Sequence, residues 1–186
     1  MAYRRIRSGI LASLLLAATG TAAPADAMEF RGGLLRQDAF SLWAIGTNRE
    51  RAWAILAEVG FDPVARVLGG DIAPMVGGTL APGRELDTAY AGLTWTLEGD
   101  AAFLRLGIGG LIHSGNLENR AAAARRRQLG SRVLFHVPVE VGLRLGPDGG
   151  AAPSWVGLYF SHMSNADLSD PNPGMDNLGV RLGWRF

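Results

Sequence analysis

The sequence predicts an all-β fold, an eight-stranded antiparallel transmembrane β-barrel with a filled polar interior. Three observations support this prediction. Segments of about ten residues alternate in side-chain character, the connections between them differ regularly in length, and an export signal precedes a chain that ends on an aromatic residue. Outer-membrane strands have about this length and alternate apolar and polar positions.

The first 27 residues have the features of a signal peptide. Arg4, Arg5 and Arg7 form a basic start, and the apolar run at 10–18 is too short to span a bilayer as a helix. The tripeptide ending at Ala27 has the small–x–small form of a signal-peptidase site. We therefore predict a signal peptide at 1–27 and a barrel at 28–186, with a short membrane anchor as the alternative reading of the first segment.

Eight strands are predicted from period-two alternation between turn signals. The pattern is clearest at 133–143, where every second residue is Val, Phe or Leu and the residues between them include His136 and Glu140. A soluble sandwich would also alternate, but the export signal and Phe186 within an amphipathic strand favour the barrel. The predicted strands lie at roughly 28–35, 51–61, 70–79, 88–97, 101–113, 131–145, 153–164 and 176–186.

Connection lengths predict which end of the barrel lies outside the cell. The odd-numbered connections (36–50, 80–87, 114–130 and 165–175) are long, and the even-numbered ones (62–69, 98–100 and 146–152) are shorter. Transmembrane barrels have short periplasmic turns and longer external loops. We therefore expect the odd connections to be external in a bacterial outer membrane.

An eight-stranded barrel has an interior filled by side chains. The polar residues predicted to point inward can form a buried network, in which a pair such as Glu140 with an arginine is structural. These residues are Glu58, Tyr90, Arg105, His136, Glu140, Arg144, Arg181 and Arg185. In the helix-like stretch 119–130, Arg125, Arg126 and Arg127 either bind phosphates of a lipid head group or belong to a solvated loop.

Composition excludes several classes of function. Removing three arginines and Asp26 with the signal leaves 15 basic residues from 18 and 16 acidic ones from 17, so there is no net positive field for nucleic acid. The absence of cysteine excludes thiolate chemistry. The three histidines do not have the spacing of zinc ligands, so the sequence does not support a zinc site. We expect no metal and no cofactor.

His162, Ser164 and Asp176 are the candidate catalytic residues. Strand period places His162 and Ser164 on the outward face of one predicted strand, and it gives Asp176 the outward parity of the next. The external ends of these antiparallel neighbours meet, so the three side chains converge at the boundary of lipid and water. A nucleophile, a base and an orienting carboxylate are what serine hydrolysis requires. The alternative is that His162 and Ser164 merely end a strand.

The stretch "HMSNADLSDPNPGMD" resembles the signature of the lipid A 3-O-deacylases, the PagL-type outer-membrane enzymes. His162, Ser164 and Asn165 match the His-x-Ser-Asn motif, and Asn172 and Gly174 match the Asn-x-Gly of the loop. The acid position falls on Asp176, where the family usually has Glu. Because Asp is one methylene shorter, we expect Asp176→Glu to keep or raise activity.

The resemblance implies that the chain is a serine esterase hydrolysing the 3-O-linked acyl chain of lipid A in lipopolysaccharide, without metal. Ser164 would be the nucleophile, His162 the base and Asp176 the orienting acid, with Asp167 and Asp170 as competing acids. Asn172, with Asn165 and backbone near Ala166, would support the oxyanion. A non-catalytic barrel with a structural or adhesive role and a phospholipase-like esterase are the alternatives. A homodimer is left open.

Overall fold

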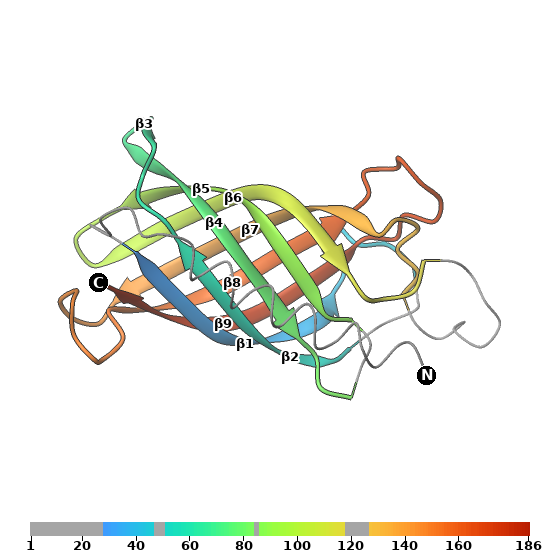
Figure 1. Cartoon of the computed structure of the whole chain (residues 1–186), viewed down its shortest axis with the longest axis horizontal. Helices are drawn as coiled ribbons and strands as arrows, with labels where there is room; N and C mark the ends of the chain where they lie inside the picture. Colours follow the sequence, from blue (N-terminus) through green and yellow to red (C-terminus); the bar gives the residue numbers. More distant parts are fainter. Residues whose placement is uncertain (1–27, 47–50, 84–85, 118–126) are drawn as a thin grey trace, which may run out of the picture.

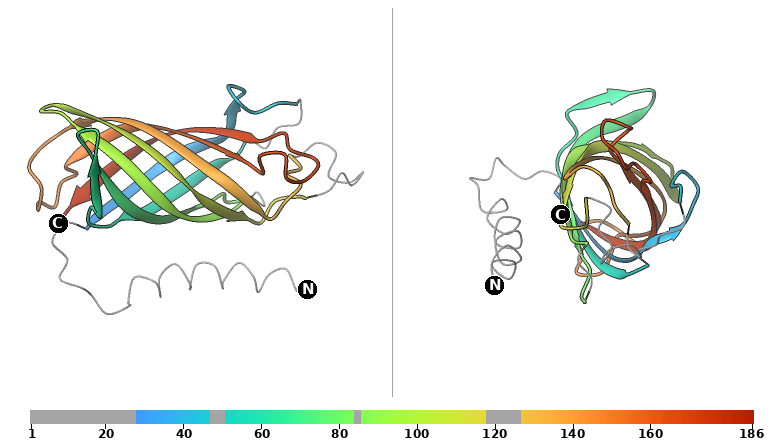
Figure 2. Two further views of the ribbon diagram at one scale, coloured as in Figure 1. Left: turned by 90° about the horizontal axis from the view of Figure 1, so that it is seen from above. Right: turned by 90° about the vertical axis from the view of Figure 1, so that its right-hand side faces the viewer.

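The computed structural model describes residues 28–46, 51–83, 86–117 and 127–186, so the predicted signal peptide lies outside the described residues. Within them, eight long antiparallel strands close into a barrel, as the end-on view shows (Figures 1 and 2). The strands pair in the order β2-β1-β9-β8-β7-β6-β5-β4, and pairing of β2 with β4 closes the ring. No helix in the described part of the chain is long and apolar enough to cross a membrane.

The observed strands agree with the predicted ones to within a few residues at most ends. Their bounds are β1 Glu29–Phe40, β2 Trp53–Gly60, β4 Gly70–Leu80, β5 Thr88–Glu98, β6 Ala102–His113, β7 Val133–Arg144, β8 Trp155–Ser164 and β9 Met175–Arg185. A short strand that we did not predict, β3 (Ala65–Val67), pairs with the start of β4 in a hairpin beyond the barrel (Figure 1).

The largest error concerns the end of β1, which was predicted at residue 35 and extends to Phe40. Gln37 and Asp38 read as loop residues, yet both are buried. Gln37 donates to the carbonyl of Leu86, and the Asp38 backbone N–H donates to Asn177 Oδ1. Polar partners inside the barrel therefore prolong a strand whose side chains do not look like those of a strand.

The two ends of the barrel differ. We call the end that carries 41–52, 81–87, 114–132 and 165–174 the loop end, and the opposite end the terminal end. At the terminal end the N–H of Phe186 donates to the carbonyl of Met28, so the described start and the end of the chain lie together (Figure 1). Observed strand bounds bear out the predicted alternation of connection lengths only in part, because 61–69 at the terminal end is longer than 81–87 at the loop end, and 145–154 is as long as 165–174.

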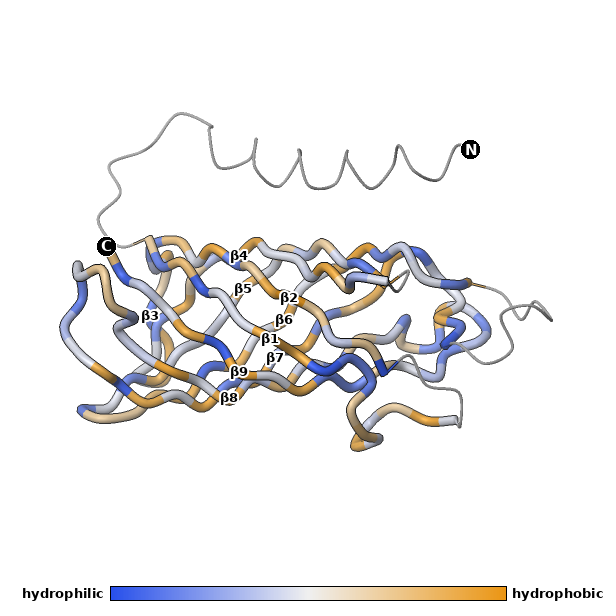
Figure 3. The backbone as a smooth tube through the Cα atoms, turned by 90° about the horizontal axis from the view of Figure 1, so that it is seen from below, coloured by the Kyte–Doolittle hydropathy of each residue, from blue (hydrophilic) through white to orange (hydrophobic). Residues whose placement is uncertain are grey.

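Inward and outward faces follow the predicted parity. Along β7, Leu134, His136 and Glu140 are buried, while Phe135 and Val141 are exposed. Apolar and polar positions alternate along the tube in the same way (Figure 3). Glycines make room for large inward neighbours, because a Cβ at Gly183 would overlap the indole of Trp155.

The lumen holds a closed ring of charged side chains. Arg31 bonds Glu29 and Glu58, Arg181 bonds Glu58 and Glu140, and Arg105 bonds Glu140 and Glu29. All six side chains are at most 7% exposed. Three carboxylates and three guanidinium groups thus neutralise one another inside the barrel, as predicted for Glu140.

Four of the predicted inward residues are not members of this ring: Tyr90, which donates to Glu58, His136, which bonds Tyr159, and Arg144 and Arg185. Arg144 and Arg185 lie near the terminal end, only partly buried, and both bond Glu98. Conversely, Glu29 and Arg31 belong to the ring but were not predicted, because their polar side chains stand at the very start of the first strand.

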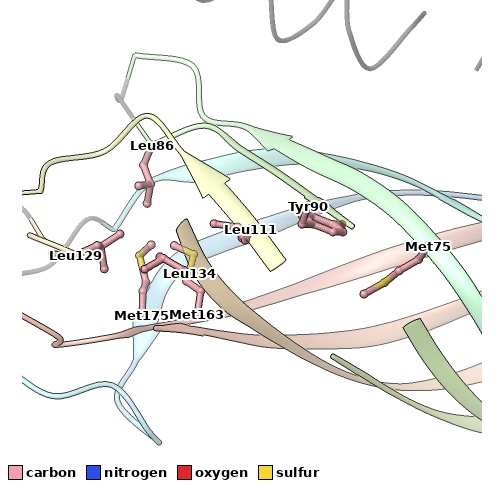
Figure 4. Close-up of a cluster of buried hydrophobic side chains, with 8 residues drawn as sticks. All are labelled: Met75, Leu86, Tyr90, Leu111, Leu129, Leu134, Met163 and Met175. Atoms are coloured by element: carbon pink, nitrogen blue, oxygen red, sulfur yellow. The ribbon is translucent and has the colours of Figure 1, made fainter. Parts of the chain in front are cut away.

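An apolar cluster fills the barrel towards the loop end. It contains Met75, Leu86, Tyr90, Leu111, Leu129, Leu134, Met163 and Met175 (Figure 4). Met163 and Met175 face each other across β8 and β9 and are almost fully buried. They point inward next to His162 and Asp176, so the wall behind the candidate site is densely packed.

Candidate active site

The candidate site lies where β8 and β9 reach the loop end. His162 on β8 stands directly opposite Asp176 on β9 in the strand register. His162 and Ser164 continue the outward row of Leu158 and Phe160, as parity predicts. Adjacent antiparallel strands therefore place residues that are fourteen positions apart side by side.

A short hydrogen bond joins His162 to Asp176. His162 Nδ1 lies 2.7 Å from Asp176 Oδ1, and the carboxylate is fully buried while the imidazole is 14% exposed. A carboxylate only accepts hydrogen bonds, so it fixes the imidazole tautomer with hydrogen on Nδ1. The Nε2 atom is thereby left as the acceptor, which is the arrangement that a general base needs.

Three consecutive backbone amides hold the other oxygen of Asp176. The N–H groups of Leu42, Trp43 and Ala44 donate to Oδ2 over 2.6, 2.8 and 3.0 Å. Backbone N–H groups arranged in this way favour a negative charge. Asp176 lies on the outward face beside His162, as parity predicts, but it does not face lipid, because it is fully buried under segment 41–46 of the first loop.

His162 is enclosed by an aromatic ring and a glycine. The indole of Trp43 meets the imidazole edge-on at 5.5 Å between centroids, and it also contacts Phe160. At Gly174 an added Cβ would lie 2.8 Å from Cε1 of His162, and the backbone there has φ +60°. Both the space and the dihedral angle therefore require glycine at this position.

Ser164 is the last residue of β8 and is half-buried. It stands two residues beyond His162 on the same face, opposite Phe135 of β7. Positions two apart on one face lie about 7 Å apart between Cα atoms, which an imidazole and a hydroxyl can span. Among the hydrogen bonds of the described residues none joins Ser164 to His162, so the strand spacing alone relates the two side chains.

The predicted oxyanion residues lie in the turn after β8. Asn172 Oδ1 accepts from the backbone N–H of Asn165 at 3.0 Å, and Asn172 Nδ2 donates to Asp167 at 2.9 Å. Ala166 and Asp167 both have positive φ, 53° and 61°. This left-handed pair turns the chain back so that the loop closes on the end of β8.

Asn165 anchors that loop. Its side chain is 2% exposed, and its Nδ2 donates to the carbonyls of Ser169 and Leu129 at 2.7 and 3.1 Å. It therefore ties the fourth external loop to the third. The carboxylate against His162 is that of Asp176, whereas the Asp167 carboxylate is bonded to Asn172.

Of the three arginines predicted in the third loop, only Arg127 is among the described residues. It is 2% exposed and bonded to Asp38, so it is neither a solvated cation nor a free phosphate ligand. Among the described residues, no group of three or more His, Asp or Glu side chains is arranged to hold a metal ion.

The sequence analysis predicted a connection at 36–50 but not its contact with Asp176. The groups that hold Asp176 are backbone amides, which any residue type supplies, so 41–46 carries no signature in its side chains. The contact of Trp43 with His162 was not predicted either, because a tryptophan in a loop does not by itself indicate a site. Only Gly174 carried a signal, as part of the Asn-x-Gly match.

Comparisons with known proteins point to one family. The family model described as "Lipid A 3-O-deacylase (PagL)" matches residues 30–185. The lipid A deacylase PagL of Bordetella bronchiseptica is 28% identical over 92 residues, which are 50% of this chain and 44% of that protein. The match thus spans less than half of that relative's length.

A solved structure shows the same fold. The crystal structure of the outer membrane enzyme PagL aligns with a TM-score of 0.58 at 17% identity, over 84% of this chain and 98% of that one. The described residues therefore have the architecture of an outer-membrane barrel.

Proposed function

Because the chain belongs to the lipid A 3-O-deacylase (PagL) family, we propose that it is an outer-membrane serine esterase that hydrolyses the 3-O-linked acyl chain of lipid A. The observation that supports this most is the bond between His162 and the buried Asp176, on the outward face at the loop end. A barrel without catalysis has no need of an imidazole held in one tautomer at this position.

The reaction requires two transfers. Ser164 Oγ attacks the ester carbonyl while its proton passes to His162 Nε2, and Asp176 stabilises the imidazolium that forms. The tetrahedral intermediate collapses, the sugar 3-oxygen leaves, and it takes the proton from Nε2. Water then attacks the acyl-enzyme with His162 again as base, releasing the fatty acid and restoring Ser164.

The oxyanion would be stabilised by donors in the turn that follows Ser164. The backbone N–H of Ala166 and the second N–H of Asn172 Nδ2 are the candidates, because the first N–H is bonded to Asp167. The turn itself is held by Asn165.

The substrate would be presented by the membrane itself. Outward residues below the site, such as Leu158 and Val180, are exposed and apolar, as lipid contact requires. The first loop adds Leu42, Trp43 and Ile45, all more than half exposed beside the site. An ester at the outer-leaflet surface therefore reaches Ser164 without leaving the lipid.

The test is lipid A mass spectrometry on cells that express the protein or a variant. Ser164→Ala should abolish loss of the 3-O-acyl chain, with a fall on the order of 10⁶-fold where catalytic residues act as a unit. Ser161→Ala is the matched control, because Ser161 lies on the same strand but faces inward against Asn177. Complete removal of the 3-O-acyl chain in cells that express Ser164→Ala would show that Ser164 is not the nucleophile.

The same experiment separates the alternatives. Unchanged lipid A with the wild-type protein, together with release of fatty acid from phospholipid vesicles, would indicate a phospholipase-like esterase. Activity on neither lipid would indicate a structural or adhesive barrel.

A further inference from the structure

We propose that Arg127 is a positioning residue for the active site, which fixes the first external loop so that its backbone amides hold Asp176 against His162. The proposal rests on the proposed function and adds a residue from the third loop to the site. Arg127 touches neither His162 nor Ser164 in the hydrogen bonds of the described residues. It acts through segment 41–46.

Arg127 is itself rigidly held. Its Nε and Nη2 donate to Asp38 Oδ2 and Oδ1 at 2.9 and 2.8 Å, and both side chains are at most 1% exposed. A guanidinium that binds a carboxylate through two parallel bonds has its plane fixed. The third nitrogen, Nη1, therefore points in a defined direction.

This third nitrogen forms a hydrogen bond to the first loop. Arg127 Nη1 donates to the carbonyl of Ile45, and it lies 3.4 Å from the carbonyl of Pro173. The N–H of Ile45 donates to the same Pro173 carbonyl at 2.7 Å. Both backbone polar groups of Ile45 are thus bonded: its carbonyl to Arg127 of the third loop and its N–H to Pro173 of the fourth loop.

The residue that Arg127 holds is adjacent to an amide that binds Asp176. Ile45 directly follows Ala44, whose N–H is the last of the three that donate to Asp176. Three residues before the segment, on β1, Asp38 is bonded through its own N–H to Asn177, the neighbour of Asp176 on β9. The buried pair therefore secures the chain on both sides of the stretch that covers Asp176.

The packing around Arg127 places it deep in the barrel mouth. Leu129, two residues on, lies in the apolar cluster beside Met163 and Met175 (Figure 4). Its N–H bonds the carbonyl of Asn116, which pins the returning arm of the third loop. A rigid base of this kind is what a positioning role requires.

Turnover measurements on purified barrel in detergent with lipopolysaccharide test the proposal. Arg127→Met should lower kcat on the order of 10²-fold, as expected for a small displacement of catalytic groups, and leave KM close to the wild-type value. Arg127→Lys keeps the charge without the two-bond fork and should fall in between. Arg132→Met is the matched control, because Arg132 bonds only carbonyls of the third-loop region in the described contacts, those of His113 and Gly115.

A double-mutant comparison separates positioning from general destabilisation. If Arg127 acts through the acid, Arg127→Met should slow the Asp176→Asn enzyme by less than about threefold, since the interaction it supports is already lost. A full 10²-fold further fall in the double mutant would overturn the proposal. So would a wild-type kcat in a folded Arg127→Met barrel.

Hydrogen exchange decides the proposal independently of activity. The amides of Leu42, Trp43 and Ala44 should exchange at least tenfold faster in Arg127→Met or Arg127→Lys and at the wild-type rate in Arg132→Met. If the wild-type protein releases no acyl chain, the proposed function fails, but this measurement still tests whether Arg127 fixes the first loop. Unchanged protection of the three amides in both Arg127 variants would overturn it.

Discussion

At the scale of single residues, the short side chain of the candidate acid Asp176 makes close contacts on both of its oxygens. The family usually places Glu where this chain has Asp176, and the shorter side chain suggested a lengthened contact. Instead, the direct strand pairing of Asp176 with His162 gives a bond of 2.7 Å, and loop amides occupy the other oxygen. The shorter side chain therefore reaches His162 directly from the neighbouring strand.

This geometry reverses the expectation for Asp176→Glu. The acid is fully buried and its contacts are made, so an added methylene must displace either His162 or segment 41–46. We now expect turnover to fall on the order of 10²-fold, with Asp176→Asn lower still. Initial rates on lipopolysaccharide in detergent measure this, and a Glu variant as fast as the wild type would show that the loop adjusts freely.

At the scale of elements, the outward faces of β8 and β9 form the surface on which the site depends. Leu158 and Val180 face each other across these strands and are 58% and 52% exposed. In an outer-membrane barrel such positions meet the hydrocarbon of the lipid. A charge there must be taken out of water, whereas a charge beyond the strand end need not be.

Leu158→Arg should therefore lower the free energy of unfolding by about 2–4 kcal/mol in lipid vesicles, the value for arginine near the middle of the bilayer. Leu145→Arg is the control, because Leu145 is equally exposed but lies just after β7 at the terminal end. Urea titrations followed by the gel shift of folded barrel give both values. Equal, small effects would mean that this face does not contact lipid.

At the scale of the whole molecule, the ring of six charges joins strands that are not neighbours. It links β1, β2, β6, β7 and β9 across the lumen. Each carboxylate in the ring meets two of the ring's arginines, and Glu29 also forms an ion pair with Arg185. Loss of one member leaves its partners buried without full compensation, which is more costly than loss of an exposed pair.

Glu140→Gln should therefore destabilise the barrel by about 3–5 kcal/mol. Arg66→Met is the control, because Arg66 and Asp71 form an ion pair at the terminal end with side chains 72% and 36% exposed, and it should change stability by less than about 1 kcal/mol. Urea unfolding in vesicles measures both. A stable Glu140→Gln barrel would mean that apolar packing alone holds the lumen together.

The sequence by itself determined the eight strands, their inward and outward faces and the pairing of His162 with Asp176. These follow from a period of two, which each strand carries in its own residues and which fixes the neighbours once the strands are antiparallel. Only the tertiary structure decided that Asp176 is buried, that Arg127 pairs with Asp38 and that the first loop covers the site. Those features depend on backbone amides and on contacts between distant loops, and neither leaves a periodic trace in the sequence.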